Sequence, residues 1–364
     1  MKVFFIKQNI SVIRNMIDQA VANALKQAGV EIEEFDFAHY YFVYKDIVEK
    51  YGLHEKMNFD ESFAIGMAKE ITSNMIHKAV LHYQPDLVVM LNGDVLDPTT
   101  VKVLKKLGQR VICWQVDDPY TIDKTAILSP FLEKIFSVDR SCLPHYRQSG
   151  CKNVEYLPLG FIESIYFKQS VEEKYHSDLC FIGTPFIGSY RVKILDELIP
   201  FLIENKIHFK IIGTHVHGQS WANSLKNYAL AKEFISEDFV SPEETAKYYN
   251  GAKIVLNIHR DSFFGPVDAN QNQIEATSLN ERAFNIGACG AFQIIDDKRD
   301  FSDFYDAGKD LEVFRNIDDL QTKIKRYLAD SKLRESIAEQ GYQKTIQSLS
   351  MLHSVRRLLE SSLK

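Results

Sequence analysis

Short apolar segments alternate with segments of helical length along this chain, and no other feature of the sequence restricts its fold so strongly. Strands that alternate with helices form a parallel sheet, because each crossover between parallel strands must pass over one face of the sheet. In the first half of the chain, we expect strands at residues 2–6, 31–37, 87–91, 111–116 and 134–137, and helices at residues 12–28, 61–83 and 99–107.

The alternation starts again after residues 156–178, a segment without a clear period that we interpret as an interdomain connection. The chain is therefore expected to form two Rossmann-like, doubly wound α/β domains that face a cleft, at residues 1–160 and 161–350. A C-terminal helix at residues 351–364 is expected to pack back on the N-terminal domain. In the second half, we expect strand-and-loop segments at residues 178–184, 209–215, 239–240, 253–259 and 291–296, and helices at residues 191–204, 243–250, 279–290, 317–329 and 332–348.

The composition is typical of a globular protein without a dominant anionic partner. The 364 residues are 45% hydrophobic, and the net charge of -6 argues against nucleic acid or an anionic membrane as the main partner. No apolar run reaches the roughly 18–20 residues that cross a bilayer, so no transmembrane segment is expected. The five cysteines are scattered and form no CxxC pair, which predicts neither a disulfide scaffold nor a zinc site. We therefore expect a cytoplasmic protein.

Two adjacent carboxylates follow the expected strand at residues 111–116, in the sequence "VICWQVDDPYTID". Asp117 and Asp118 are catalytic candidates, because open α/β sheets place their chemistry at the carboxyl ends of strands. Neighbouring residues on an extended chain point in opposite directions, so only one of the two is expected to face the cleft. The alternative is structural: Asp118 and Pro119 form a turn, and Asp117 caps a nearby element.

Two glycines follow apolar strands in the second half, within the sequences "FIGT" and "IIGT". Gly183, Thr184 and Gly213 are candidates for ligand binding, because glycine lets backbone N–H groups approach a phosphate or a sugar without a Cβ atom between them. The alternative is that each glycine makes an ordinary tight turn at the end of its strand.

A second set of candidates lies further along, in "KIVLNIHR" and "SLNERAFNIGACG". His259 and Arg260 follow a strand, and Arg260 suits a phosphate because its guanidinium group is a rigid fork. Asn280 is placed to cap the next helix, whose first turn carries Arg282 and whose free N–H groups favour an anion. The alternatives are a satisfied core histidine, a salt bridge from Arg260 to Asp261, and a surface pair of Glu281 with Arg282.

Taken in order, several motifs resemble the CgeB-type spore-maturation glycosyltransferases: "CWQVDDPY", "FSVDRSCLPHYRQSGCKNVEYLPLG", "DLCFIGT", "KIVLNIHR" and "TSLNERAFNIGACGAFQIID". The resemblance runs from about Pro85 to near the C-terminus. It implies a GT-B fold, a nucleotide-diphosphate sugar donor in the C-terminal domain, an acceptor against the N-terminal domain, and no essential metal or cofactor. The expected activity is transfer of a sugar to a hydroxyl group of a protein, a glycan or a cell- or spore-surface component.

One residue departs from the pattern of related GT-B enzymes. They often carry a glutamate, which binds the ribose of the donor, five residues before the glycine of "ACG"; that position here is Asn285. An amide can still bond to a hydroxyl group, but without the assistance of a negative charge. Asn285 is therefore a donor-binding candidate whose effect on donor affinity is open.

Three other functions are alternatives to glycosyl transfer by a GT-B enzyme. A metal-dependent GT-A enzyme would need a DxD motif, which neither Asp117–Asp118 nor "NGDVLD" provides. A nucleotide-sugar epimerase shares the two-domain fold but needs no acceptor. A protein that binds a nucleotide or sugar without catalysis would fit the loss of the glutamate at Asn285.

Overall fold

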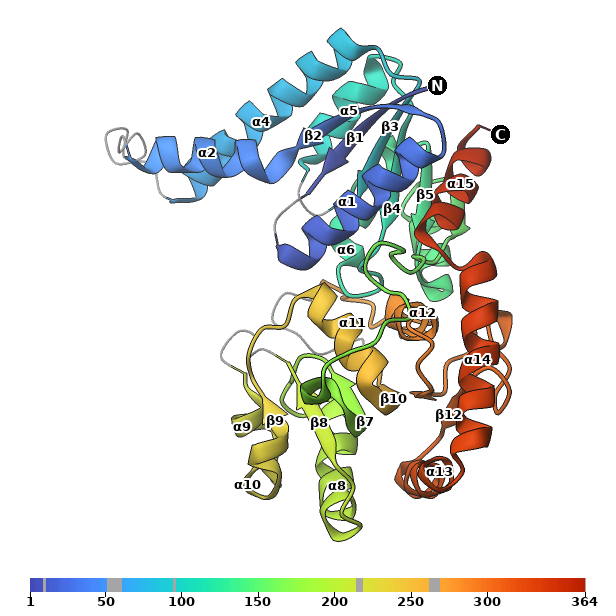
Figure 1. The fold of residues 1–364 in the computed structure, drawn as a ribbon. Helices are drawn as coiled ribbons and strands as arrows, with labels where there is room; N and C mark the ends of the chain where they lie inside the picture. The colour runs from blue at the N-terminus through green and yellow to red at the C-terminus, as the bar shows by residue number, and fades with distance from the viewer. Residues whose placement is uncertain (9–10, 51–60, 94–95, 214–218, 262–268, 364) are drawn as a thin grey trace. The chain divides into compact units, whose positions relative to one another are not determined.

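The structure is a computed structural model, and it describes residues 1–8, 11–50, 61–93, 96–213, 219–261 and 269–363. Its described residues form two six-stranded sheets, one in each of two units, and every strand in each sheet pairs in parallel with its neighbours (Figure 1). The α/β class predicted from the sequence is confirmed. The first unit consists of Met1–Leu157, Ala269–Asn272 and Ser354–Lys364, and the second of Pro158–Asp268 and Gln273–His353.

The sheet of the first unit has the strand order β2-β1-β3-β4-β5-β6. The chain builds β2 on one side of β1 and then crosses to build β3 on the other side, so β1 and β3 flank the topological switch point. Every residue of β3 and β4 is buried, as expected for central parallel strands covered on both faces. The elements are β1 (Lys2–Lys7), α1 (Val12–Gln27), β2 (Glu31–Asp36), α2 (Phe37–Lys50), α4 (Glu61–Tyr83), β3 (Leu87–Leu91), α5 (Pro98–Lys106), β4 (Val111–Gln115), α6 (Ile122–Ala126), β5 (Lys134–Ser137), α7 (Leu143–Gln148) and β6 (Asn153–Tyr156).

The sheet of the second unit has the strand order β12-β11-β10-β7-β8-β9, so its switch point lies between β7 and β10. The strand expected at residues 239–240 is wrong: the strand is β9, at Ile235–Ser236, and Phe239 is exposed. The elements are β7 (Ser177–Ile182), α8 (Tyr190–Glu204), β8 (Phe209–Ile212), α9 (Trp221–Ser224), α10 (Tyr228–Ala231), β9, α11 (Pro242–Gly251), β10 (Ala252–Asn257), α12 (Glu281–Ala288), β11 (Gln293–Asp296), β12 (Glu312–Phe314), α13 (Ile317–Ala329), α14 (Ser331–Ser348) and α15 (Met351–Ser362).

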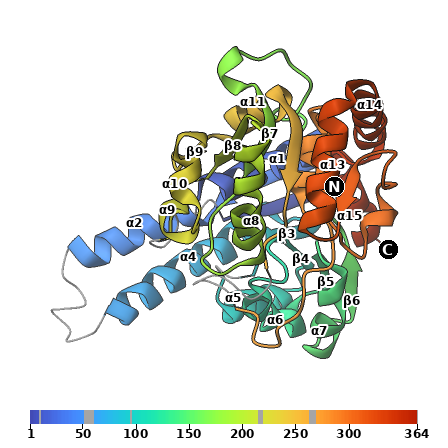
Figure 2. The same ribbon diagram turned by 90° about the horizontal axis from the view of Figure 1, so that it is seen from below.

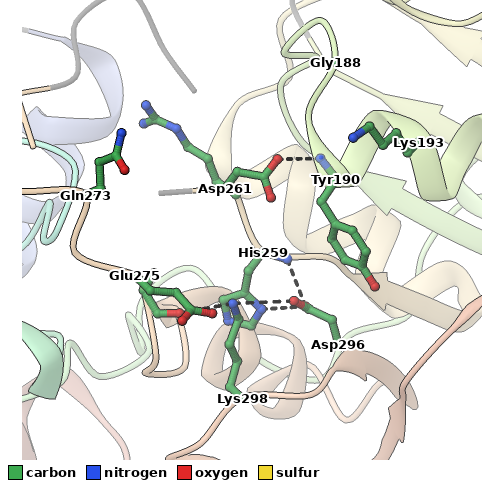
Figure 3. Close-up of a pocket in the computed structure, with 11 residues that line it drawn as sticks. Gly188, Tyr190, Lys193, His259, Asp261, Gln273, Glu275, Asp296 and Lys298 are labelled. Carbon is green, nitrogen blue, oxygen red and sulfur yellow. Dashed lines mark hydrogen bonds and ion pairs between the residues drawn. The ribbon is translucent and has the colours of Figure 1, made fainter. Parts of the chain in front are cut away.

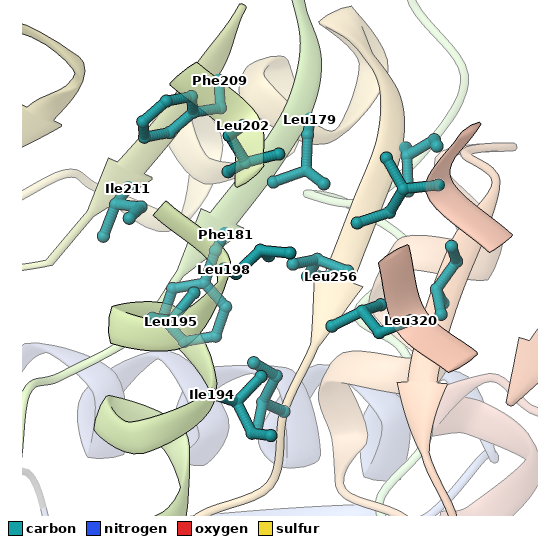
Figure 4. Close-up of a cluster of buried hydrophobic side chains, with 14 of the residues drawn as sticks. Leu179, Phe181, Ile194, Leu195, Leu198, Leu202, Phe209, Ile211, Leu256 and Leu320 are labelled. Atoms are coloured by element: carbon teal, nitrogen blue, oxygen red, sulfur yellow. The ribbon is translucent and has the colours of Figure 1, made fainter. Parts of the chain in front are cut away.

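The core of the second unit lies between α8 and the strands of the sheet (Figure 4). In α8, Leu195, Leu198 and Leu202 recur every three or four residues and Ile194 lies four residues before Leu198, which is the spacing of one helix face. That face packs against buried side chains of the strands, among them Leu179, Phe181, Phe209, Ile211 and Leu256. This packing fixes the strand ends from which the site residues project.

The helix α2 differs from the sequence prediction, which placed Phe37 in a strand and assigned no element to residues 38–50. Its sequence, "FAHYYFVYKDIVEK", is rich in aromatic and β-branched residues, which favour strands. In the structure α2 lies beside α4 in both views (Figure 1 and Figure 2). Tertiary packing therefore overrides local propensity at this position.

Two further sequence expectations concern membranes and cysteines. Within the described ranges, no helix combines the length and the apolar character needed to cross a bilayer. All five cysteines are buried thiols without a disulfide partner.

Candidate functional site

A pocket of about 460 Å³ lies in the second unit, at the carboxyl ends of strands near the switch point (Figure 3). Its walls come from the ends of β10 and β11, the start of α8, and the segment before α12. Of the donor-binding candidates, His259 and Arg260 line it. Lys193 and Lys298, which the sequence analysis did not single out, add two further cations to its lining.

His259 is a buried connection between three elements. Its Nδ1 atom lies 2.6 Å from Asp296 Oδ1, and the backbone N–H of Asn280 donates to its Nε2 atom at 3.1 Å. Because Nε2 accepts, the ring proton is on Nδ1 and is donated to Asp296 (Figure 3). Burial lowers the pKa of His259, although Asp296 opposes the shift. His259 is therefore neutral, and it joins the ends of β10 and β11 to the start of α12.

The cations around the pocket have different surroundings. The guanidinium group of Arg260 stacks over the ring of Phe186, with Cζ 4.8 Å from the ring centroid. Lys298 Nζ lies 3.7 Å from Asp296 Oδ2, and Lys193 is exposed. Asp261 accepts a hydrogen bond from the backbone N–H of Tyr190, the first residue of α8. The pocket is therefore lined by cationic side chains, and Asp261 and Asp296 connect the chain segments around it.

The start of α12 is capped as predicted. The side chain of Asn280 accepts from the backbone N–H of Ala283 at 3.2 Å, and its amide pairs reciprocally with that of Asn257 at 3.0 and 3.2 Å. The side chain of Asn280 thus forms its hydrogen bonds with its own helix and with the end of β10. It holds α12 next to His259, and so next to the pocket.

Two buried polar atoms of α12 have no hydrogen-bond partner among the described residues: Arg282 Nη1 and Asn285 Oδ1. The two residues are three apart, so they share one face of the helix. Asn285 is only 6% exposed, and no ion pair forms between Arg282 and Glu281 in the described part of the chain. Unpaired buried polar groups are rare because each costs about 1–3 kcal/mol. Contacts within the described residues therefore leave hydrogen-bonding capacity unused at two of the predicted donor-binding residues.

The glycine candidates have a structural explanation. A Cβ atom on Gly213 would lie 1.8 Å from the carbonyl oxygen of Gly183, and one on Gly183 would lie 2.9 Å from the Phe181 ring. The ends of β7 and β8 therefore need glycine to approach each other. Gly183, Thr184 and Gly213 do not line the pocket. The carbonyl of Thr184 accepts a hydrogen bond from buried Arg191, which also donates to the carbonyl of Ile258 after β10.

In the first unit, the two adjacent carboxylates have opposite surroundings. Asp118 is buried, and it accepts hydrogen bonds from the Tyr146 hydroxyl at 2.7 Å and from the Ser137 hydroxyl. Burial raises the pKa of Asp118 to about 8, although these hydrogen bonds lower it. The side chain of Asp117 is 37% exposed. Because both oxygens of Asp118 are used inside the unit, we keep the predicted catalytic role for Asp117 alone.

The burial of Asp118 predicts a pH-dependent effect of Asp118→Asn on stability. Between its ordinary pKa of 3.8 and its folded pKa of about 8, the carboxyl group binds more protons in the folded state, so its contribution to stability falls as pH rises through this range. Asparagine cannot ionise, and its amide can still donate to Ser137 and accept from Tyr146. We expect the melting temperature of the variant relative to wild type to rise by more than about 2 °C between pH 5 and pH 8. Parallel melting curves across this range, followed by circular dichroism, would contradict the assignment.

This chain is similar to known proteins in sequence and in structure. Residues 193–360 match a family described as glycosyl transferase-like. Spore protein CgeB of Bacillus subtilis (strain 168) is 28% identical over 270 residues, which are 72% of this chain and 78% of that protein. The resemblance inferred from the motifs is confirmed.

Two solved structures are similar over nearly the whole chain. Sucrose-phosphate synthase (tll1590) from Thermosynechococcus elongatus matches with a TM-score of 0.63 and 10% identity, over 99% of this chain and 98% of its own. Anabaena Alr3699/HepE, solved in complex with UDP and glucose, matches with a TM-score of 0.62 and 11% identity, over 99% of both chains. Identity this low shows the fold alone, and the predicted GT-B fold is confirmed.

Proposed function

We propose that this chain, which has a GT-B fold and is similar to spore protein CgeB, is a glycosyltransferase that transfers a sugar from a uridine-diphosphate sugar to an acceptor hydroxyl group, without a metal ion. The observation that carries the proposal is the pair of unpartnered buried atoms on one face of α12, Arg282 Nη1 and Asn285 Oδ1. HepE has been solved in complex with UDP and with UDP-glucose, which supports uridine diphosphate as the nucleotide.

In the proposed donor site, cationic groups bind the diphosphate and the side chain of Asn285 binds the ribose. The diphosphate binds near the cations of the pocket, Arg260, Lys193 and Lys298, and near Arg282 at the positive end of α12. The ribose hydroxyl groups lie near Asn285, whose free oxygen accepts a hydrogen bond. His259 is not a phosphate ligand in this proposal, since both of its ring nitrogens are occupied.

The proposed reaction breaks the bond between the anomeric carbon and the diphosphate, which leaves with the electron pair. The acceptor oxygen bonds to the anomeric carbon, and its proton passes to the carboxylate of Asp117. The cations stabilise the charge that develops on the leaving diphosphate. Metal independence stays a prediction, which turnover in the presence of a chelator would test.

The acceptor and the location are proposed more broadly. The name of the Bacillus relative supports a spore-surface component, and a protein or another glycan is equally compatible with hydroxyl chemistry. We propose the cytoplasm as the location, as expected from the sequence.

Asn285→Ala separates a binding role from a structural one. We expect the affinity for UDP to fall about 3- to 10-fold, since one neutral hydrogen bond contributes about 0.5–1.5 kcal/mol. The melting temperature of the ligand-free protein should fall only through the lost packing of this buried side chain, because Asn285 Oδ1 has no hydrogen bond to lose. Calorimetric titration with UDP and thermal melting measure the two quantities.

Asn227→Ala is the matched control in the same unit. Asn227 Nδ2 donates to the carbonyl of Asp196 at 2.9 Å, so its loss should lower the melting temperature and leave UDP affinity unchanged. If wild type does not bind UDP, the proposed donor is wrong. If Asn285→Ala binds UDP as tightly as wild type does, Asn285 is not part of the donor site.

A further inference from the structure

Four polar side chains meet at the carboxyl edge of the first sheet. Gln8 follows β1, Asn92 follows β3, and Asp117 lies two residues beyond β4, while Arg14 comes from the first turns of α1. Because β1, β3 and β4 are neighbours in the sheet, the group lies at the switch point between β1 and β3. In open α/β sheets, this is the position where ligands bind.

The carboxylate of Asp117 is held through one of its two oxygens. Arg14 Nη2 lies 2.5 Å from Asp117 Oδ2, and Asn92 Nδ2 donates to the same oxygen at 2.9 Å. Oδ1 accepts no hydrogen bond from any described residue, and the side chain is 37% exposed, against 18% for Arg14. The contacts therefore fix the orientation of the carboxylate and leave its second oxygen available.

Asn92 contacts Asp117 from an unusual backbone conformation. It is fully buried and has a φ of 49°, a backbone conformation that a residue with a side chain adopts rarely. Its Oδ1 atom accepts the backbone N–H of Val116 at 2.7 Å while its Nδ2 atom donates to Asp117. Gln8 supports the other donor, because its side-chain oxygen accepts from Arg14 Nη1.

We propose that Asp117 Oδ1 binds a hydroxyl group of a saccharide acceptor, and that Arg14 and Asn92 are positioning residues that hold the carboxylate for this contact. The inference rests on the proposed glycosyl transfer, because it assigns the acceptor side of that reaction. A carboxylate oxygen can only accept hydrogen bonds, so its ligand must donate, as a hydroxyl group does. The charge of Arg14 is offset by Asp117, so the group does not favour an anionic ligand.

The experiment uses the full-length protein with saturating UDP and four monosaccharides: glucose, galactose, mannose and N-acetylglucosamine. Binding of each sugar is followed by saturation-transfer-difference NMR. We expect wild type to bind at least one sugar. Arg14→Gln should weaken that binding about 10-fold, because Asp117 loses the charge-assisted hydrogen bond that orients its carboxylate, and Arg14→Lys should restore most of it. Asn92→Gly, which suits the positive φ but removes the amide, should weaken binding in the same direction.

Arg110→Gln is the matched control. Arg110 pairs with Glu133 at the amino-terminal edge of the same sheet, so sugar binding should stay at the wild-type level. Binding of UDP to each variant is measured in parallel, and failure of wild type to bind UDP would count against the donor proposal alone. The acceptor assignment is overturned if UDP binds but none of the four sugars does, or if Arg14→Gln and Arg110→Gln bind sugar equally well.

Discussion

Asp117→Asn is expected to lower turnover by about 10²- to 10⁴-fold, the usual contribution of a general base. The substitution keeps the size and shape of the side chain but removes the negative charge that would accept the proton of the acceptor hydroxyl group. The affinity for UDP should change little, since Asp117 belongs to the first unit and α12 to the second. Turnover is measured as UDP released from a panel of UDP-sugars, in buffer with EDTA so that the proposed metal independence is tested as well.

Two further variants test whether the loss of turnover is specific to Asp117 or follows the loss of any carboxylate in the first unit. Asp86→Asn changes an exposed carboxylate of the same unit that accepts from the backbone N–H of Lys2, and it should leave turnover unchanged. Asp118→Asn should also retain turnover, because the buried carboxyl group is already bonded to Ser137 and Tyr146. If Asp117→Asn folds and retains normal turnover, or if only Asp118→Asn loses it, the assignment of the base is wrong.

Arg282→Ala is expected to weaken binding of UDP by about 10- to 100-fold, because a hydrogen bond to a charged group contributes about 1.5–3 kcal/mol. One nitrogen of its guanidinium group is buried without a partner, so the free protein loses no hydrogen bond there when the side chain is removed. The charge is close enough to His259 to lower the pKa of the ring, after burial and together with Lys298. Arg282 thus acts on the same region as the pocket cations, where the diphosphate is proposed to bind.

Much of the fold could be predicted from the sequence because the central strands are continuous apolar runs. The expected strand at 87–91 coincides with β3, and that at 111–116 ends one residue beyond β4. The cap at Asn280 was predictable because its side chain acts on its own helix. These features depend on neighbours in the sequence, which local patterns record.

Other features depend on distant segments and left no local pattern. Helix α2 forms beside α4, against the strand preference of its aromatic residues. Alternation along an extended chain predicts that Asp117 and Asp118 differ, but only the three-dimensional contacts with Tyr146 and Arg14 show which of them is buried. Lys193 reaches the pocket from α8, far along the chain from the strand end at His259.

The glycine candidates illustrate an ambiguity of sequence motifs. A glycine after a strand has the same appearance whether a ligand or another segment of the chain comes close to it. At Gly213 the close neighbour is the carbonyl oxygen of Gly183, so packing of two strand ends explains this glycine, whereas at Gly183 the close neighbour is the ring of Phe181. By contrast, the unpartnered atoms of Arg282 and Asn285 could be recognised only in the folded protein, where burial and hydrogen bonds are known.

The most direct test of the donor site is calorimetric titration of UDP and of uridine into wild type, Arg282→Ala and Arg315→Ala. Arg315 is 81% exposed and lies in the same unit, so its variant controls for the loss of one positive charge. We predict that Arg282→Ala alone loses about 10- to 100-fold in affinity for UDP, and that uridine, which has no phosphate, binds all three proteins equally. Equal UDP affinity in wild type and Arg282→Ala would contradict the account.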